Sequence, residues 1–110
     1  MSGRDRAVRW LIELDASLET AAALVARGRD CYDGDVAIPL ACEALCTRVG
    51  DLAKKLVDAD PSRFSDAIWS LAARNRDFVV HHYSRLDRDL LWNTVAHDLP
   101  RLHALVIDER

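Results

Sequence analysis

Residues 68–83 read IWSLAARNRDFVVHHY, and the rest of the chain is interpreted as a scaffold around this stretch. Its apolar residues recur at helical spacing and are expected to face a core: Ile68, Leu71, Ala72, Phe78 and Val79. The same helix, or its end, also carries two arginines, two histidines and a tyrosine. A helix with one apolar stripe needs partner helices to cover that stripe, so the stretch predicts a helical bundle.

The segments before this stretch predict two more helices. The first is expected from about Asp5 to Gly28, a glycine that suits a helix end, and a loop should follow over residues 29–36. The second has Pro39 in its first turn and ends at residues 58–61, where two aspartates and a proline turn the chain. The central helix would then be capped by one of two residues, Ser65 or Asp66.

The segment after the stretch predicts one last helix. It should start near Asp87, a good N-cap, and Pro100 should kink it or split it in two. No alternating strand pattern and no internal repeat is visible. The sequence therefore predicts a single all-α domain over residues 1–110, an up-and-down bundle of four helices, or five if the last is split. Trp69 and Trp92 are expected in its core.

Composition limits the function classes. The chain has 110 residues, of which 50 % are hydrophobic and 30 % charged, and its formal net charge is −3. An acidic protein has no general attraction for the phosphate backbone, so sequence-independent coating of DNA is excluded. Any contact with RNA must come from a local basic patch, for which the candidates are Arg74, Arg76, Arg85 and Arg88.

The cysteines point to a reducing compartment and not to a metal site. Cys31, Cys42 and Cys46 are odd in number, and we interpret them as small buried hydrophobes. Cys42 and Cys46 share a helical face, but no histidine or third cysteine stands beside them, which makes a zinc site the less favoured alternative. We therefore expect no metal, no cofactor and a cytoplasmic protein. Residues 21–26, the longest apolar run, are too few to span a membrane, and no signal peptide is recognisable.

The polar residues of the central stretch suit phosphodiester chemistry or nucleotide binding. A guanidinium binds phosphate through two parallel hydrogen bonds, and an imidazole exchanges protons near neutral pH. Arg76 and His81 are the catalytic candidates, whereas Arg74, Asn75 and Tyr83 are candidates for contacting RNA or a nucleotide. Asn75 falls on the apolar stripe, where its amide is expected to bond a loop or the other polar residues.

The spacing of the catalytic candidates raises a geometric difficulty. Arg76 and His81 are five residues apart, which separates them by about 140° around an ideal helix. One straight helix therefore does not aim both side chains at one phosphate. Either the helix distorts near His81, or the site is shared between two subunits.

Each candidate also has a purely structural interpretation. Arg76 could form a salt bridge with Asp77 or with an aspartate of another helix, which would offset the cost of placing a charge among apolar residues. His81 could be a hydrogen-bonded core or interface histidine. Tyr83 could pack its ring against the last helix. These alternatives are open at the level of the residues alone.

The pattern Arg76-x4-His81-x-Tyr83 resembles the signature of the HEPN superfamily, in its HepT-like (DUF86) branch. The resemblance covers the chain from Ala41 onward and includes Trp69 before the arginine and the last helix through residues 97–100. The second helix of that branch often carries Gly-Glu-Ala, where this chain has Gly-Asp-Leu at residues 50–52. Six residues separate Arg74 from His81, and this spacing also fits the looser pattern of the superfamily.

The resemblance implies a metal-independent endoribonuclease toxin of a type VII (HepT/MntA) toxin–antitoxin system, acting as a homodimer with its motif at a shared cleft. Arg76 would hold the scissile RNA phosphate, His81 would transfer the proton, and Tyr83 would position RNA and accept AMP from an MntA-like nucleotidyltransferase antitoxin. The alternative is a non-catalytic nucleotide- or substrate-binding subunit of a minimal nucleotidyltransferase. A third possibility is an interaction bundle in which the motif is structural.

Overall fold

The computed structural model describes the backbone of residues 2–81 and 85–110 and their side chains outside residues 77–87. The described part is helical, without strands, which confirms the all-α prediction. Its elements in chain order are α1 (Gly3–Ala26), α2 (Arg29–Gly34), α3 (Ala37–Ala59), α4 (Ala67–His81), α5 (Arg85–Asn93), the π-helical turn η1 (Thr94–Asp98) and α6 (Leu99–Glu109).

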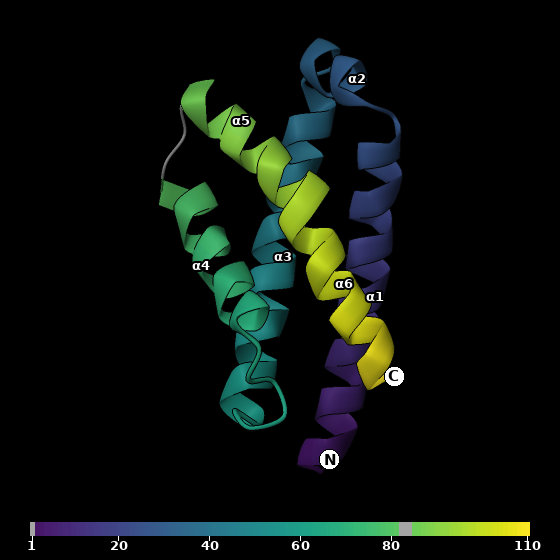
Figure 1. The fold of residues 1–110 in the computed structure, drawn as a ribbon, viewed down its shortest axis with the longest axis vertical. Coiled ribbons are helices and arrows are strands. Elements are labelled where there is room, and N and C mark those ends of the chain that lie inside the picture. Colours follow the sequence, from purple (N-terminus) through teal and green to yellow (C-terminus); the bar gives the residue numbers. More distant parts are fainter. Residues whose placement is uncertain (1, 82–84) are drawn as a thin grey trace.

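The long helices run up and down the bundle, as expected. In Figure 1, α1 rises from the N-terminus, α3 returns beside it, α4 rises again, and α5, η1 and α6 descend together as the fourth arm. Both termini lie toward one end of the long axis (Figure 1). No helix in the described ranges is long and apolar enough to cross a bilayer.

Local signals explain most helix boundaries. The first helix begins at Gly3, two residues earlier than expected, because the Ser2 hydroxyl caps it by accepting from the Asp5 N–H at 3.2 Å. Gly28 follows α1 with a φ of 91°, a left-handed conformation that glycine adopts without strain. Of the two residues considered for capping α4, Asp66 accepts a hydrogen bond from the Ile68 N–H at 3.0 Å.

Two boundary predictions were wrong. Residues 29–36 were expected to be a loop, but α2 forms there because the buried Tyr32 ties it to the bundle. Its hydroxyl donates to the Arg88 carbonyl of α5 at 2.7 Å. Helix α5 begins at Arg85, two residues before the predicted start, so Asp87 is inside the first turn and is not the N-cap.

Arg29 strengthens the link between α2 and α5. Its Nε lies 2.9 Å from Asp33 Oδ1, and its terminal nitrogen contacts Asp89 of α5. The guanidinium also lies over the rings of Tyr32 and Trp92, 5.3 and 5.7 Å from their centroids. Trp92 is half-buried and packs against the core beneath this arginine, which confirms its predicted core position in part. These contacts of Arg29 hold α5 in place directly after the segment that carries the motif.

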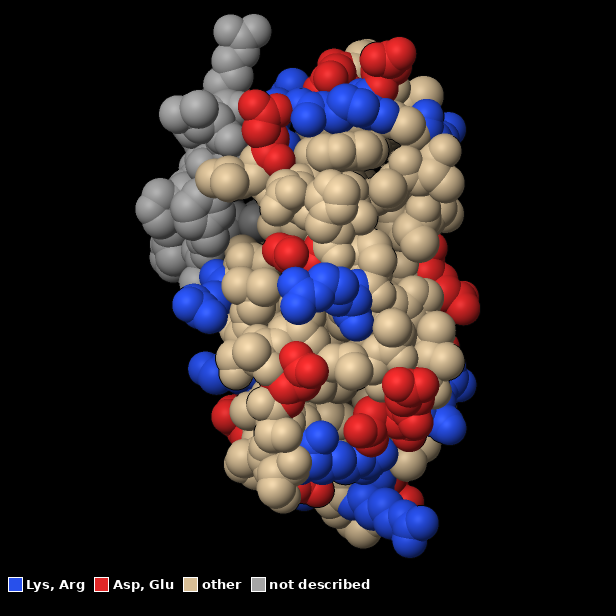
Figure 2. Space-filling model, viewed as in Figure 1, with Lys and Arg blue, Asp and Glu red and all other residues tan. Residues whose placement is uncertain are grey.

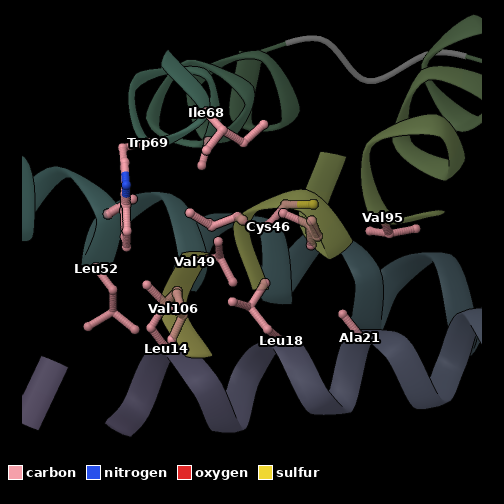
Figure 3. Close-up of a cluster of buried hydrophobic side chains, with 14 of the residues drawn as sticks. Leu14, Leu18, Ala21, Cys46, Val49, Leu52, Ile68, Trp69, Val95 and Val106 are labelled. Atoms are coloured by element: carbon pink, nitrogen blue, oxygen red, sulfur yellow. The ribbon is translucent and has the colours of Figure 1, made fainter. Parts of the chain in front are cut away.

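The core lies between α1, α3 and the α5–α6 arm, with α4 packed on α3. Figure 3 shows the apolar side chains that meet there, among them Leu14, Leu18, Val49, Trp69 and Val106. Trp69 is 2 % exposed and its ring meets Phe64 edge-on with centroids 4.9 Å apart, which confirms its predicted core position. The buried face of α4 up to Ala72 thus fixes the helix on which the candidate residues stand.

The interruption expected at Pro100 occurs before the proline. The Leu99 N–H bonds the Thr94 carbonyl, five residues earlier, so η1 is a wider π turn between α5 and α6. Pro100 then occupies the first turn of α6, where its missing N–H removes no intrahelical bond. The last arm is therefore divided, and the division places Asp98 beside α4.

Gly50 permits the closest approach of α3 to α4. A Cβ placed on it would lie 2.3 Å from the Arg76 Cβ and 2.9 Å from the Ala72 carbonyl oxygen. Both distances are far below van der Waals contact, and neither atom belongs to the flexible end of a side chain. The glycine that weakens the isolated helix by about 1 kcal/mol is thus required by tertiary packing.

We expect Gly50→Ala to destabilise the fold. Overpacking costs about 1–3 kcal/mol, of which the better helix propensity of alanine recovers at most about 1 kcal/mol. Urea unfolding followed by circular dichroism should show a lower midpoint than wild type. Gly34→Ala is the matched control, because nothing lies within 4 Å of its Cβ position. Equal midpoints for the two variants would contradict the close contact.

Candidate functional site

A groove with a volume of about 380 Å³ lies between α3 and α4, and two of the candidate arginines, Arg74 and Arg76, line it. Its walls carry three cationic and two acidic side chains, with small residues between them. From α3 and α4 the lining residues are Gly50, Asp51, Lys54, Val57, Asp58, Ser70, Ala73, Arg74 and Arg76. A basic residue set open to solvent is suited to binding a phosphate.

Arg76 is held at one end of this groove. Gly50 lets its Cβ press against α3, and its Nε lies 3.0 Å from Asp51 Oδ1. Of the two kinds of salt bridge that the sequence left open, the pairing with an aspartate of another helix is therefore present. The Arg76 and Asp51 side chains are 36 % and 50 % exposed, and an ion pair so open to water stabilises a fold by only about 0–1 kcal/mol. Such a pair holds the guanidinium near α3 at the end of the groove.

Helix α4 stays α-helical from Arg76 to His81, its last residue. The five-residue step therefore keeps its ideal geometry, about 140° of rotation and about 7.5 Å of rise. The helix is thus continuous between these two residues, and a distortion directly after His81 would fall on residues 82–84, outside the described part of the chain. The His81 side chain and Tyr83 lie outside the described part of the chain, so their roles stay predictions.

The other two candidates point in different directions. Arg74 is exposed and lines the groove. The Asn75 side chain is directed instead to η1, where its Nδ2 donates to Asp98 Oδ2 at 3.4 Å. The sequence interpretation had expected a loop or another motif residue as the partner of Asn75, and this expectation was wrong. The role of Asn75 in RNA binding stays a prediction, and the observed contact joins α4 to the last arm.

The sequence interpretation did not assign Asp51, Lys54 or Ser70 to the site. Asp51 and Lys54 belong to the second predicted helix, one and four residues after Gly50. The available signal was the glycine inside a long helix, since such a position often marks a close approach of another helix. The residue at the position of the branch's usual glutamate is still a carboxylate, and it is this carboxylate that contacts Arg76.

A second polar cluster lies on α1 and α6. The ligand atoms of Asp15, Glu19 and His103 lie within 4.8 Å of one another, a grouping that the sequence analysis did not identify. His103 Nε2 is 2.7 Å from Asp15 Oδ1, and Arg110 contacts the other oxygen of Asp15. These contacts, led by the hydrogen bond with His103, lower the pKa of Asp15. The carboxylate is thus already engaged by two partners of its own chain.

The cysteines divide into two environments. Cys42 and Cys46 are buried as expected, and burial raises the pKa of their thiols to about 11 and about 12. Thiols of this kind stay protonated and are poor zinc ligands. Cys31 is exposed, so the prediction that all three are buried was wrong for this residue. It stands on α2, the segment that the sequence did not reveal as a helix.

The family model described as "Ribonuclease HepT-like" matches residues 28–108 of the chain. The matched part includes α2 through most of α6, and therefore the groove, Gly50 and the candidate motif. No solved structure matches the chain.

Proposed function

Because the chain belongs to the HepT-like family of ribonucleases, we propose that it is the endoribonuclease toxin of a type VII (HepT/MntA) toxin–antitoxin system. The observation that supports this most is the position of Arg76. A glycine contact and the Asp51 carboxylate fix this arginine at a solvent-open groove, where a phosphate can reach it.

In the proposed reaction, His81 removes the proton from an RNA 2′-hydroxyl. The 2′-oxygen then attacks the adjacent phosphorus to form a 2′,3′-cyclic phosphate, and the bond to the 5′-oxygen breaks as that oxygen takes a proton from water. Acid–base assistance of this kind contributes about 10²–10⁴ in rate. Arg76 binds the phosphate and stabilises the charge that develops on it. None of these steps requires a metal ion, and DNA is no substrate because it lacks the 2′-hydroxyl.

The geometry of α4 supports a homodimer. In a regular helix the positions of Arg76 and His81 are about 140° apart, which favours a phosphate shared between two copies over one held by a single copy. A second copy that faces the first would bring the arginine of one chain near the histidine of the other. Tyr83, two residues further, would contact the RNA at the same cleft.

Substitution of the catalytic residues tests the proposal. We expect Arg76→Ala and His81→Ala each to abolish RNA cleavage and growth inhibition. The Arg76 variant should keep its melting temperature nearly unchanged, because its ion pair with Asp51 is exposed. Arg74→Ala should reduce cleavage less. Arg101→Ala, an exposed arginine of α6, is the matched control for loss of one charge.

Several outcomes would contradict the mechanism. Full cleavage by the His81 variant would show that His81 does not transfer the proton. Loss of cleavage in EDTA would show that the reaction depends on a metal ion. If the wild-type protein binds RNA or a nucleotide tightly but never cleaves, the chain is instead the non-catalytic subunit of a minimal nucleotidyltransferase.

We also propose that the antitoxin regulates this site through Tyr83. The tyrosine oxygen would attack the α-phosphate of ATP and release pyrophosphate, which leaves AMP on the side chain. The added phosphate would then compete with RNA for the arginines of the groove.

Incubation with the cognate MntA-like nucleotidyltransferase, ATP and Mg²⁺ should add the mass of AMP and suppress cleavage, whereas Tyr83→Phe should prevent both effects. Inhibition without any adduct would show that complex formation alone neutralises the toxin.

A further inference from the structure

We propose that Lys54, Arg74 and Ser70 form a second phosphate subsite, which binds the RNA phosphate next to the one held by Arg76. This inference rests on the proposed function and extends it, because it gives the RNA strand a path along the groove between α3 and α4. All three side chains line that groove together with Arg76.

The order of residues on the two helices places this subsite beside the first. Helices α3 and α4 run in opposite directions (Figure 1), and Gly50 meets Arg76 where they are closest. Lys54 follows Gly50 by four residues, about 6 Å along α3. Ser70 precedes Arg76 by six residues in α4, so both helices move away from Arg76 in the same direction. The cations therefore follow one another along the groove.

The charges of the groove favour an anion at this second position. Lys54 and Arg74 are both exposed, and neither forms an ion pair with any residue that the structure describes. Asp51 is engaged with Arg76, which leaves Asp58 as the other carboxylate of the groove. The groove is thus locally cationic on a chain whose net charge is −3.

This local concentration of charge is not a property of the whole surface. On the face that Figure 2 presents, lysines and arginines alternate with aspartates and glutamates among the described residues. A flexible single strand whose phosphate is already on Arg76 gains affinity from the next cation along its path. An isolated phosphate does not, and this difference makes the proposal testable.

The chain supplies a matched control for Lys54. Lys55 is the adjacent residue and is also exposed, but it belongs to another surface. Its Nζ lies 6.0 Å from the ring centroid of Trp10 in α1, and it lines a depression that also contains Glu13. Replacing either lysine by alanine removes the same charge from the same helix, so only their positions differ.

The experiment measures cleavage and binding of a fluorescein-labelled single-stranded RNA of about twelve nucleotides by the full chain. We expect Lys54→Ala to raise KM and Kd about five- to tenfold with kcat changed less than about twofold, and to lower the salt dependence of binding by about one phosphate contact. Lys55→Ala should stay within about twofold of wild type, and Lys54→Arg should restore binding. A dinucleotide with a single phosphate should not distinguish the Lys54 variant from wild type.

The inference fails separately from the proposed function. Equal KM and Kd for the two alanine variants on the longer RNA would overturn the subsite even if the protein is an active ribonuclease. If wild type cleaves no RNA, the proposed function fails, while the binding comparison still decides whether Lys54 contacts the strand. If Lys54→Ala weakens binding of the nucleotidyltransferase and leaves RNA binding unchanged, the groove is a protein-docking surface and the subsite is wrong.

Discussion

The contact between Gly50 and Arg76 is the constraint on which the site depends. The Cβ of Arg76 packs against α3 at Gly50, where a side chain on α3 would clash with it. The same close approach brings Asp51 Oδ1 within 3.0 Å of the Arg76 Nε, on a side chain that is 36 % exposed. The hydrogen that Gly50 carries in place of a methyl group thus determines where the Arg76 side chain lies against α3.

The rest of the bundle holds the motif segment from both of its ends. On one side, Ile68, Trp69 and Ala72 bury α4 against α3. On the other side, Tyr32 and Arg29 of α2 fix α5 through a hydrogen bond, an ion pair and ring contacts. The residues between these two anchors include most of the candidate motif, and they lie within the part of the chain that the family model matches. A ribonuclease site on a small domain benefits from such fixed ends, because catalysis depends on accurate placement of its groups.

Sequence patterns predicted what depends on local spacing. The burial of Ile68 and Ala72, the stop at Gly28 and the cap at Asp66 all follow from residues a few positions apart, and the structure confirms them. Helix α2 escaped prediction because a contact 56 residues away in the chain stabilises it. The pairing of Arg76 with Asp51 could not be chosen from sequence either, since periodicity shows which face of a helix is buried but not the level at which two helices meet. The position of the groove, and the presence of Lys54 in it, could not be predicted for the same reason, because both depend on where along their lengths α3 and α4 meet.

The sharing of one cleft between two copies is the central claim of this account, and subunit mixing tests it most directly. Arg76→Ala and His81→Ala chains, each inactive alone, are unfolded together, refolded as mixed dimers and assayed for RNA cleavage. If the arginine of one copy acts with the histidine of the other, each mixed dimer contains one intact site and cleavage returns to about half the wild-type rate per dimer. If mixed dimers form but remain inactive while refolded wild-type protein cleaves, both residues act within a single chain and the shared cleft is wrong.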